Sequence, residues 1–316
     1  MINSSSAAVS RPLRSTPFKA GFWLVVLGAA LWGVDPLFRI LLLKSMTSTQ
    51  IVLLEHVLLF LAAAPVLWKN RAELKGIGWR QVGALLFISW GGSALATILF
   101  TTALSSGNIN AVVLLQKLQP LFAILMARWI LKEMLPKFFG TLLVVALIGT
   151  YLLTFGWQLP FTQVNDFIQI GSLLSMGAAA LWGGSTVMGR YMVGKMKYEA
   201  VTSLRFMLAL PLLLVITLSE GAAWHLPSGG WAVSAVFINL LLQALLPGLL
   251  SLLLYYKGLS TTKASYATLA ELSFPMMGVI INWAAFQQAV TLTQLIGFIL
   301  IWITLFYISR QKQEAA

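Results

Sequence analysis

The chain has 316 residues, of which 59% are hydrophobic and only 9% are charged, and its mean hydropathy is +0.87. A soluble domain carries about 25% charged residues, so this composition argues against a soluble enzyme, a nucleic-acid-binding protein and a disordered chain. It predicts an all-α integral membrane protein. The absence of cysteine excludes disulfide bonds and thiolate metal sites, and we expect no metal, cofactor or catalytic residue.

Residues 1–20 precede the first apolar run and contain three basic residues, Arg11, Arg14 and Lys19, but no acidic one. The apolar run at 21–43 is too long for a cleaved secretory signal and lacks a convincing small-residue cleavage site. We therefore expect 1–20 to be a cytoplasmic tail. An organellar transit peptide has a similar composition and is the alternative.

Ten apolar segments are long enough to be transmembrane helices, since a span needs about 20 residues to cross a hydrocarbon core of about 30 Å. The predicted spans are 21–43, 50–68, 81–103, 109–131, 138–157, 168–190, 200–219, 232–256, 263–284 and 291–308. They form two five-helix repeats, at 21–157 and 168–308, and leave a C-terminal tail at 309–316.

The positions of the basic residues predict the orientation of the chain. Of its 21 lysines and arginines, 17 fall in segments on the same side as the N-terminus. One, Lys44, falls on the opposite side, and Arg39, Lys117 and Arg205 fall within spans. Loops rich in Lys and Arg stay in the cytoplasm. We expect both termini in the cytoplasm and the chain in a bacterial inner membrane, so the net charge of +12 indicates topology rather than a nucleic-acid partner.

The two halves of the chain resemble each other. The sequence Ala-Ala-Leu-Trp-Gly at 29–33 recurs at 179–183, and Pro120 and Pro275 occupy the middle of the fourth and ninth spans. An odd number of spans per repeat inverts the second repeat relative to the first. Two inverted five-helix repeats are typical of secondary transporters, whose substrate sites lie near the membrane midplane between the repeats.

These stretches resemble the drug/metabolite transporter superfamily, and in particular its ten-helix EamA-type members. The resemblance covers 20–308 and rests on Leu-Trp-Gly at 31–33 and 181–183, Pro120, Leu-Lys-Glu at 131–133, Gly140 and Tyr-Lys-Gly-Leu at 256–259. The sequence departs from the family pattern at Gln287 and Gln288, where such proteins often have a Gly-Glu pair. The resemblance implies carriage of small metabolites, often by export, without naming a substrate.

One group of ionisable residues lies at the outer end of the first two spans. Such residues are costly inside a membrane and are functional candidates. Asp35 and Arg39 are one helical turn apart, and Glu55 and His56 enter the membrane from the same side, so we expect Arg39 to bridge Asp35 and Glu55. We interpret these four residues as a coupling or gating cluster. A structural ion network, or an Arg39 that extends outward beside Lys44, is the alternative.

A second ionisable pair, Lys117 and Glu271, lies at near-equivalent positions of the two repeats. Lys117 precedes Pro120 by three residues and Glu271 precedes Pro275 by four. Each lies roughly 12 Å deep, counted at 1.5 Å per residue, so the inverted repeats place both near the midplane. This pair can bind the amine and carboxylate of a zwitterion, or Glu271 can carry a coupling proton. A permanent salt bridge between the repeats is the alternative.

Aromatic residues complete the predicted substrate site. Trp32, Trp90 and Trp182 lie away from the membrane interfaces, and we expect them to line a cavity together with Tyr266 and Gln119. Helix packing is the alternative role for these tryptophans. Arg205 lies only about 8 Å from the start of its span at 1.5 Å per residue, and we expect it to extend toward the cytoplasm in a structural role.

These features together predict a secondary carrier that works by alternating access, with a small-molecule substrate and the lipid bilayer as its partners. A zwitterion such as an amino acid is the expected substrate, export the expected direction, and protons a candidate coupling ion. An organic-cation or multidrug exporter is the alternative, followed by a channel. An enzyme is not expected, because the spans hold no matched nucleophile and base.

Overall fold

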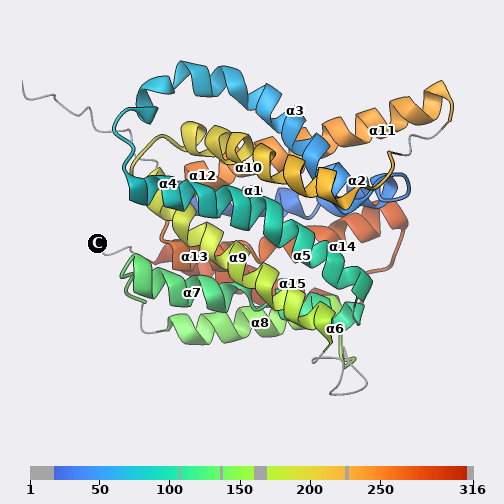
Figure 1. Ribbon diagram of the computed structural model, residues 1–316. Helices are drawn as coiled ribbons and strands as arrows, with labels where there is room; N and C mark the ends of the chain where they lie inside the picture. Colours follow the sequence, from blue (N-terminus) through green and yellow to red (C-terminus); the bar gives the residue numbers. More distant parts are fainter. Residues whose placement is uncertain (1–17, 107, 136–137, 160–168, 225–227, 312–316) are drawn as a thin grey trace, which may run out of the picture.

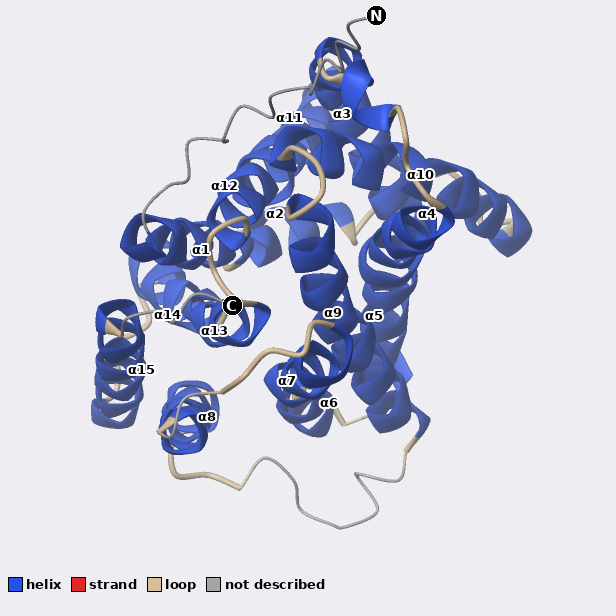
Figure 2. Cartoon of the chain, turned by 90° about the vertical axis from the view of Figure 1, so that its left-hand side faces the viewer, coloured by secondary structure: helices blue, strands red, loops and turns tan. Residues whose placement is uncertain are grey.

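The computed structural model describes residues 18–106, 108–135, 138–159, 169–224 and 228–311. The predicted tail at 1–20 therefore lies outside the described residues except for its last three, as does most of the tail at 309–316. Every regular element in the described ranges is a helix (Figures 1 and 2). Nine of these helical segments are long and apolar enough to cross a membrane, and α8 is a shorter apolar helix, as the all-α prediction requires.

The helices of the two repeats follow one another in the predicted order. The first repeat contains α1 (Phe18–Trp32), α2 (Asp35–Leu42), α3 (Ser48–Lys69), the short helix η1 (Arg71–Leu74), α4 (Trp79–Leu86), η2 (Phe87–Leu95), α5 (Ala96–Ser106), α6 (Ile109–Gln116), α7 (Gln119–Ile130) and α8 (Phe139–Phe155). The second contains α9 (Ile170–Val193), α10 (Tyr198–Glu220), α11 (Gly230–Gln243), η4 (Ala244–Leu250), α12 (Ser251–Leu259), α13 (Ala264–Ala270), α14 (Ser273–Phe286) and α15 (Leu292–Arg310).

Three spans are broken near their middle. The first changes from α1 to α2 at 33–34, the fourth from α6 to α7 at 117–118, and the ninth from α13 to α14 at 271–272. Proline has no N–H to donate to the preceding turn, and it lies in the first turn of α2 and of α7, where no such donor is needed. Each break lies just before a proline, and two of the breaks hold Lys117 and Glu271.

Two further spans contain wide helical turns at equivalent positions. The third span is π-helical over η2 and the eighth over η4, so each runs through one wide segment between ordinary α-helices. The sequence there favours bending, with Gly91 and Gly92 in η2 and Pro247 and Gly248 in η4. A π-helical turn is uncommon and occurs frequently at functional sites.

The two repeats pack against each other throughout rather than forming separate domains. Helix α1 of the first span packs along α12 of the eighth span. The equivalent helices of the opposite repeats pair in the same way, because α9 of the sixth span packs along α5 of the third. Equivalent helices also pair directly, α3 with α10 and α8 with α15. Exchanging the two repeats therefore leaves the pattern of helix contacts unchanged, as expected for inverted repeats. Figures 1 and 2 show the helices of both repeats intermixed around one centre.

Close helix approach in the centre depends on Gly183 of α9. A Cβ atom placed on Gly183 would lie 2.8 Å from the Ala123 backbone nitrogen and 2.9 Å from the Gln119 carbonyl oxygen of α7. Both distances are too short for a real side chain. Glycine is thus required there for α9 to contact α7, and this contact forms one wall of the central region between the repeats.

Candidate functional site

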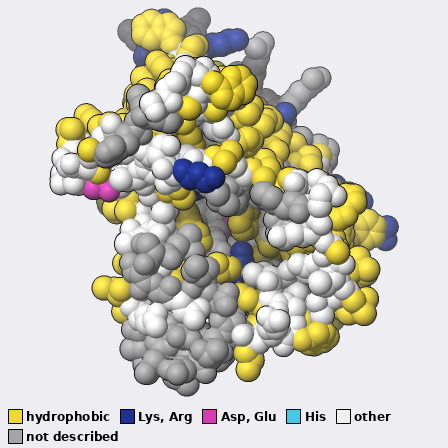
Figure 3. All heavy atoms as spheres, turned by 90° about the vertical axis from the view of Figure 1, so that its right-hand side faces the viewer, with side chains coloured by type: hydrophobic (Ala, Val, Ile, Leu, Met, Phe, Trp, Pro, Cys, Tyr) yellow, Lys and Arg dark blue, Asp and Glu magenta, His cyan; other side chains and the backbone are white. Residues whose placement is uncertain are grey.

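A cavity of about 590 Å³ lies between the two repeats. Its walls include residues of α1, α3, η2, α7, α9, α10 and α14. Leu43, Thr101 and Val113 line it near the ends of their spans on the side opposite the chain termini, whereas Tyr255 and Glu271 lie at its deep end. The face of the molecule away from the C-terminus is hollowed, and charged side chains are visible in the depth of the hollow (Figure 3). The cavity therefore opens toward this face.

The side that bears the termini is closed by polar contacts around the connection between α12 and α13. Glu133, which is only 8% exposed, accepts hydrogen bonds from the Ala264 N–H (2.8 Å), the Ser265 N–H (3.0 Å) and the Ser265 hydroxyl (2.7 Å). Arg190 donates to the backbone oxygens of Leu259 (3.1 Å) and Ser260 (2.7 Å). These contacts hold the connection between α12 and α13 against the end of α7 and against α9.

The outer ionisable cluster has the expected geometry. Arg39 forms two hydrogen bonds to Asp35, at 2.6 and 2.8 Å, and contacts Glu55 at 3.3 Å. Gln243 of α11 donates to the same Glu55 oxygen at 3.3 Å. Arg39 thus bridges Asp35 and Glu55, and all three residues line the cavity together with His56.

Glu271 lies at the break of the ninth span and is surrounded by neutral donors. Its Oε1 accepts from the Tyr255 hydroxyl at 2.6 Å and from the Thr186 hydroxyl at 2.9 Å, and its Oε2 accepts from the Gln119 amide at 2.5 Å. Its donors come from both repeats, since Gln119 belongs to the first. A carboxylate that accepts this many hydrogen bonds is stabilised without a cationic partner.

Lys117 lines the same cavity but does not form the expected ion pair. The ion pairs of the described residues do not include one between Lys117 and Glu271. The Lys117 ammonium instead lies 4.8 Å from the centre of the Phe274 ring, a cation–π contact. Glu271 is held by neutral donors instead, and the alternative of a permanent salt bridge between the repeats is wrong.

Arg205 is a cavity residue that sequence reasoning missed. It donates to the hydroxyls of Ser93 (2.6 Å), Ser185 (3.3 Å) and Tyr256 (2.7 Å), and it lines the cavity. The expectation that Arg205 extends toward the membrane surface is wrong, because these three hydroxyls hold its guanidinium in the centre. The sequence does contain a signal for polar groups at this depth, because Ser93 and Ser185 follow the two Trp-Gly-Gly sequences at 90–92 and 182–184.

Aromatic rings form two pairs at the cavity wall. Trp32 of α1 packs on Tyr255, with ring centres 5.0 Å apart, and Trp182 of α9 packs on Phe100 at 5.4 Å. All four residues line the cavity, as does Gln119. Trp32 and Trp182 occupy equivalent positions of the inverted repeats, and each packs on a ring of the other repeat.

Two of the predicted site residues are placed elsewhere. Trp90 is 40% exposed and does not line the cavity, because its indole N–H donates to the Leu208 carbonyl of α10 at 2.8 Å. Tyr266 is buried near the closed side, where its ring packs on Phe139 at 5.9 Å. The other nine, namely Trp32, Asp35, Arg39, Glu55, His56, Lys117, Gln119, Trp182 and Glu271, line the cavity.

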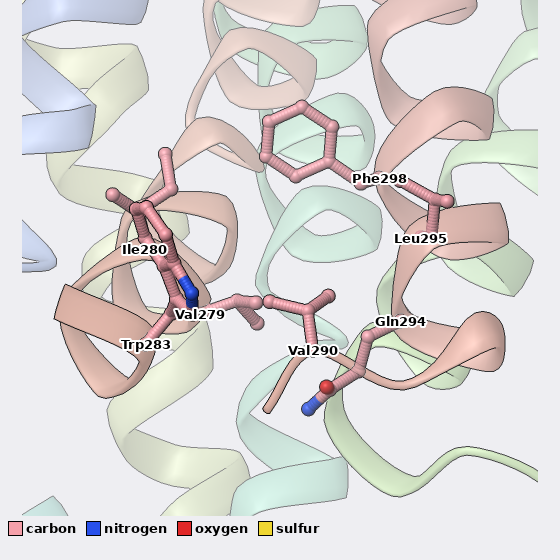
Figure 4. A pocket seen from close by; sticks show the side chains of 7 residues that line it. All are labelled: Val279, Ile280, Trp283, Val290, Gln294, Leu295 and Phe298. Atoms are coloured by element: carbon pink, nitrogen blue, oxygen red, sulfur yellow. The ribbon is translucent and has the colours of Figure 1, made fainter. Parts of the chain in front are cut away.

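A second hollow of about 170 Å³ lies between α14 and α15 (Figure 4). Apart from Gln294, its lining is apolar: Val279, Ile280, Trp283, Val290, Leu295 and Phe298. Several of these side chains are exposed on the outside of the helices. This hollow has no charged group to hold a polar substrate, so the central cavity is the candidate site.

The helical repeats and the charged cavity between them define the class of this protein as an integral membrane transporter rather than an enzyme. The model of the EamA-like transporter family matches residues 19–155 and 169–310. The chain belongs to the EamA-like transporter family, which confirms the resemblance found in its sequence.

Two comparisons add to the family match. Riboflavin transporter ImpX of Fusobacterium nucleatum subsp. nucleatum is 32% identical over 302 residues, which cover 92% of this chain and 97% of that protein. A protein of known crystal structure matches with a TM-score of 0.75 and 16% identity, over 93% of this chain and 99% of the other. The second likeness concerns the fold alone.

Proposed function

We propose that this protein is a secondary carrier for a planar, hydrogen-bonding heteroaromatic compound of the flavin type, with riboflavin as the first candidate. The observation that carries the proposal is the composition of the cavity wall. Trp32 with Tyr255, and Trp182 with Phe100, supply ring faces from both repeats. Aromatic faces stack on planar rings, and a volume of about 590 Å³ suits a small molecule.

The polar groups of the cavity fit a neutral substrate rich in carbonyl oxygens. Lys117 and Arg205 supply N–H donors, and neither forms an ion pair among the described residues. The isoalloxazine ring of riboflavin has two carbonyl groups and ring nitrogens along one edge, and its ribityl chain adds hydroxyls. The 32% identity to a protein named as a riboflavin transporter supports the same substrate class.

The proposed mechanism is alternating access about this central cavity. In the present conformation the cavity opens away from the termini, while Glu133 and Arg190 hold the other side closed. Rocking of the inverted repeats opens the closed side and closes the open one, as is general for carriers with such repeats. The broken helices and the two π-helical segments are the places where the spans bend.

Radiolabelled riboflavin flux into proteoliposomes that contain the purified protein tests the proposal. We expect saturable uptake that accelerates when unlabelled riboflavin is present inside, since counterflow distinguishes a carrier from a channel. Trp32→Ala and Trp182→Ala should each reduce uptake at least about tenfold, because each removes a stacking face. Trp90→Ala is the matched control, because Trp90 does not line the cavity. Absence of saturable flavin flux in the wild type would refute the proposal.

A second candidate is export of a zwitterion such as an amino acid. It is favoured by the positions of Lys117 and Glu271, one cation and one anion on the same cavity wall. Parallel flux measurements with an amino-acid panel and with organic cations distinguish the two candidates. Saturable amino-acid flux with no flavin flux would favour the zwitterion.

A further inference from the structure

His56, a residue of the cavity wall, has an unpaired hydrogen-bond acceptor. Its side chain is only 6% exposed and lines the cavity. The Nδ1 atom lies 2.8 Å from the Val52 carbonyl oxygen. A carbonyl oxygen can only accept, so Nδ1 carries the proton, and in the neutral ring Nε2 has a free lone pair. Nε2 is buried and has no hydrogen-bond partner in the described part of the chain.

Guanidinium donors lie on both neighbouring elements. Arg39 binds Asp35 and Glu55 through Nε and Nη2, and its buried Nη1 has no partner among the described residues. Glu55 precedes His56 in α3, so Arg39 reaches the turn that bears His56. On the other side, the His56 ring packs edge-on against Phe206, which follows Arg205 in α10, with ring centres 5.9 Å apart.

Arg205 also has a guanidinium nitrogen beside the cavity wall. Its hydrogen bonds to Ser93, Ser185 and Tyr256 use Nε and Nη1. Its Nη2 lies beside Gly92, 3.5 Å from where a Cβ atom of that residue would be, and Gly92 itself lines the cavity. One buried acceptor is thus accompanied by donors on two sides.

An unpaired buried polar atom is unfavourable unless a ligand satisfies it. A ligand group that complements one acceptor flanked by two donors is an N–H group flanked by two carbonyl groups. A cyclic imide has this arrangement. Riboflavin has such a group, because the N3–H of its isoalloxazine ring lies between the carbonyls at C2 and C4. An amino-acid zwitterion does not have it.

We propose that His56 is the specificity-determining residue of this carrier, and that its Nε2 accepts a hydrogen bond from the ring N–H of a cyclic imide. The two carbonyl groups beside that N–H face Arg39 and Arg205. This inference rests on the proposed function, since it assigns the polar edge of a flavin-type substrate to one part of the cavity. It also assigns a role to His56 that differs from gating.

Binding of riboflavin and of 3-methylriboflavin, measured by flavin fluorescence on the purified protein, tests the inference without any mutation. The methyl group replaces the imide hydrogen and leaves the ring and the ribityl chain unchanged. We expect the wild type to bind 3-methylriboflavin at least about tenfold more weakly. Equal affinity for the two compounds would overturn the inference while leaving the flavin proposal intact. Absence of binding of either flavin would overturn the proposed function as well.

Two variants test whether His56 is responsible for the preference for riboflavin over 3-methylriboflavin. His56→Phe keeps a ring of similar size but has no acceptor, so it should bind riboflavin about tenfold more weakly and bind both compounds alike. His56→Gln retains a side-chain oxygen and should keep part of the preference for riboflavin. Val57→Phe, at the neighbouring exposed position of α3, is the control and should behave like the wild type. A tenfold preference that persists in folded His56→Phe would overturn the assignment to His56.

Discussion

Gln119 and Glu271 join the two broken helices of the fourth and ninth spans. The Gln119 amide, one residue before Pro120, donates to the Glu271 carboxylate at 2.5 Å. The hydrogen bond therefore connects the repeats at the points where both helices are interrupted. A rearrangement of one repeat against the other must act on this contact, which lies at the deep end of the cavity.

Glu271→Gln is expected to abolish transport and any stimulation by a pH gradient. The amide cannot release a proton, and its NH₂ group would face donors such as Tyr255 and Gln119. We expect flux in proteoliposomes to fall at least tenfold, whereas substrate affinity changes less. Glu220→Gln is the matched control, because Glu220 also accepts hydrogen bonds, from Thr47 and Thr49, but at the end of α10. Normal, gradient-stimulated flux in Glu271→Gln would exclude Glu271 as the proton carrier.

Lys117→Met is expected to weaken substrate binding at least about tenfold, the usual effect of losing a hydrogen bond from a charged donor. Methionine keeps an unbranched side chain but has neither the charge nor the donors that Lys117 presents beside Phe274. The dissociation constants for riboflavin and for the amino-acid panel provide the measurement. Lys117→Arg should retain binding better, and a Lys117→Met protein with wild-type affinity would remove Lys117 from the site.

Glu133→Ala is expected to loosen the closed side of the cavity. It leaves the buried N–H groups of Ala264 and Ser265 without their acceptor, at a cost of about 1–3 kcal/mol per group. Because the chain has no cysteine, an Ala267→Cys reporter in α13 can be labelled with a hydrophilic maleimide. We expect faster labelling and a lower melting temperature.

Gln288→Ala is the control for this experiment, because Gln288 occupies the equivalent position in the second repeat and is exposed in this conformation. With Gln288→Ala, the Ala267→Cys reporter should be labelled at the same rate as in the parent protein. An unchanged labelling rate in Glu133→Ala would show that Glu133 does not hold this side closed.

Gly183→Ala is expected to lower the melting temperature of the detergent-solubilised protein. The added methyl group would contact the backbone of α7 at about 2.8 Å and force the two helices apart, which costs roughly 1–3 kcal/mol in a packed core. Gly177→Ala, in the same helix, would meet only Leu99 at 3.5 Å and should have little effect. Equal melting temperatures for the two variants would contradict the proposed close contact.

The predicted orientation can be tested with single cysteines. We expect Lys44→Cys to react with a membrane-impermeant maleimide in intact bacterial cells, because Lys44 lies on the side opposite the termini. Lys75→Cys should react only after the cells are permeabilised, since the positive-inside rule places its loop in the cytoplasm. Both residues are exposed in the structure. The reverse labelling pattern would invert the proposed topology.

The spans were predictable because they depend on a local property, the apolar length that a transmembrane helix needs. Their breaks were not, since Pro120 and Pro275 follow interruptions whereas Pro65 and Pro211 lie inside continuous helices. The repeat in the sequence placed Lys117 and Glu271 on one cavity. The sequence could not provide the direction in which each side chain points from its helix axis.

Arg205, Trp90 and Glu133 illustrate this limit. Counting residues gave the depth of Arg205, but only the folded chain brings Ser93 and Ser185 to its guanidinium. Trp90 lies in a π-helical segment, where the ordinary spacing of helix faces does not apply. Glu133 follows a predicted span, and nothing local shows that the start of α13 lies beside it.

Lys132 and Gln287 share a left-handed backbone, with φ angles of 55° and 53°, just before Glu133 and Gln288. The two turns are alike, but one presents a carboxylate and the other a neutral amide. Charge-assisted hydrogen bonds are roughly twice as strong as neutral ones, so the two ends of the cavity are not energetically equivalent. Under the proposed alternating-access mechanism, a molecule on the side opposite the termini reaches the site directly, whereas a molecule on the terminal side reaches it only after the Glu133 contacts break. We therefore expect the proposed cycle to be kinetically asymmetric, with the difference between Glu133 and Gln288 contributing to its resting position.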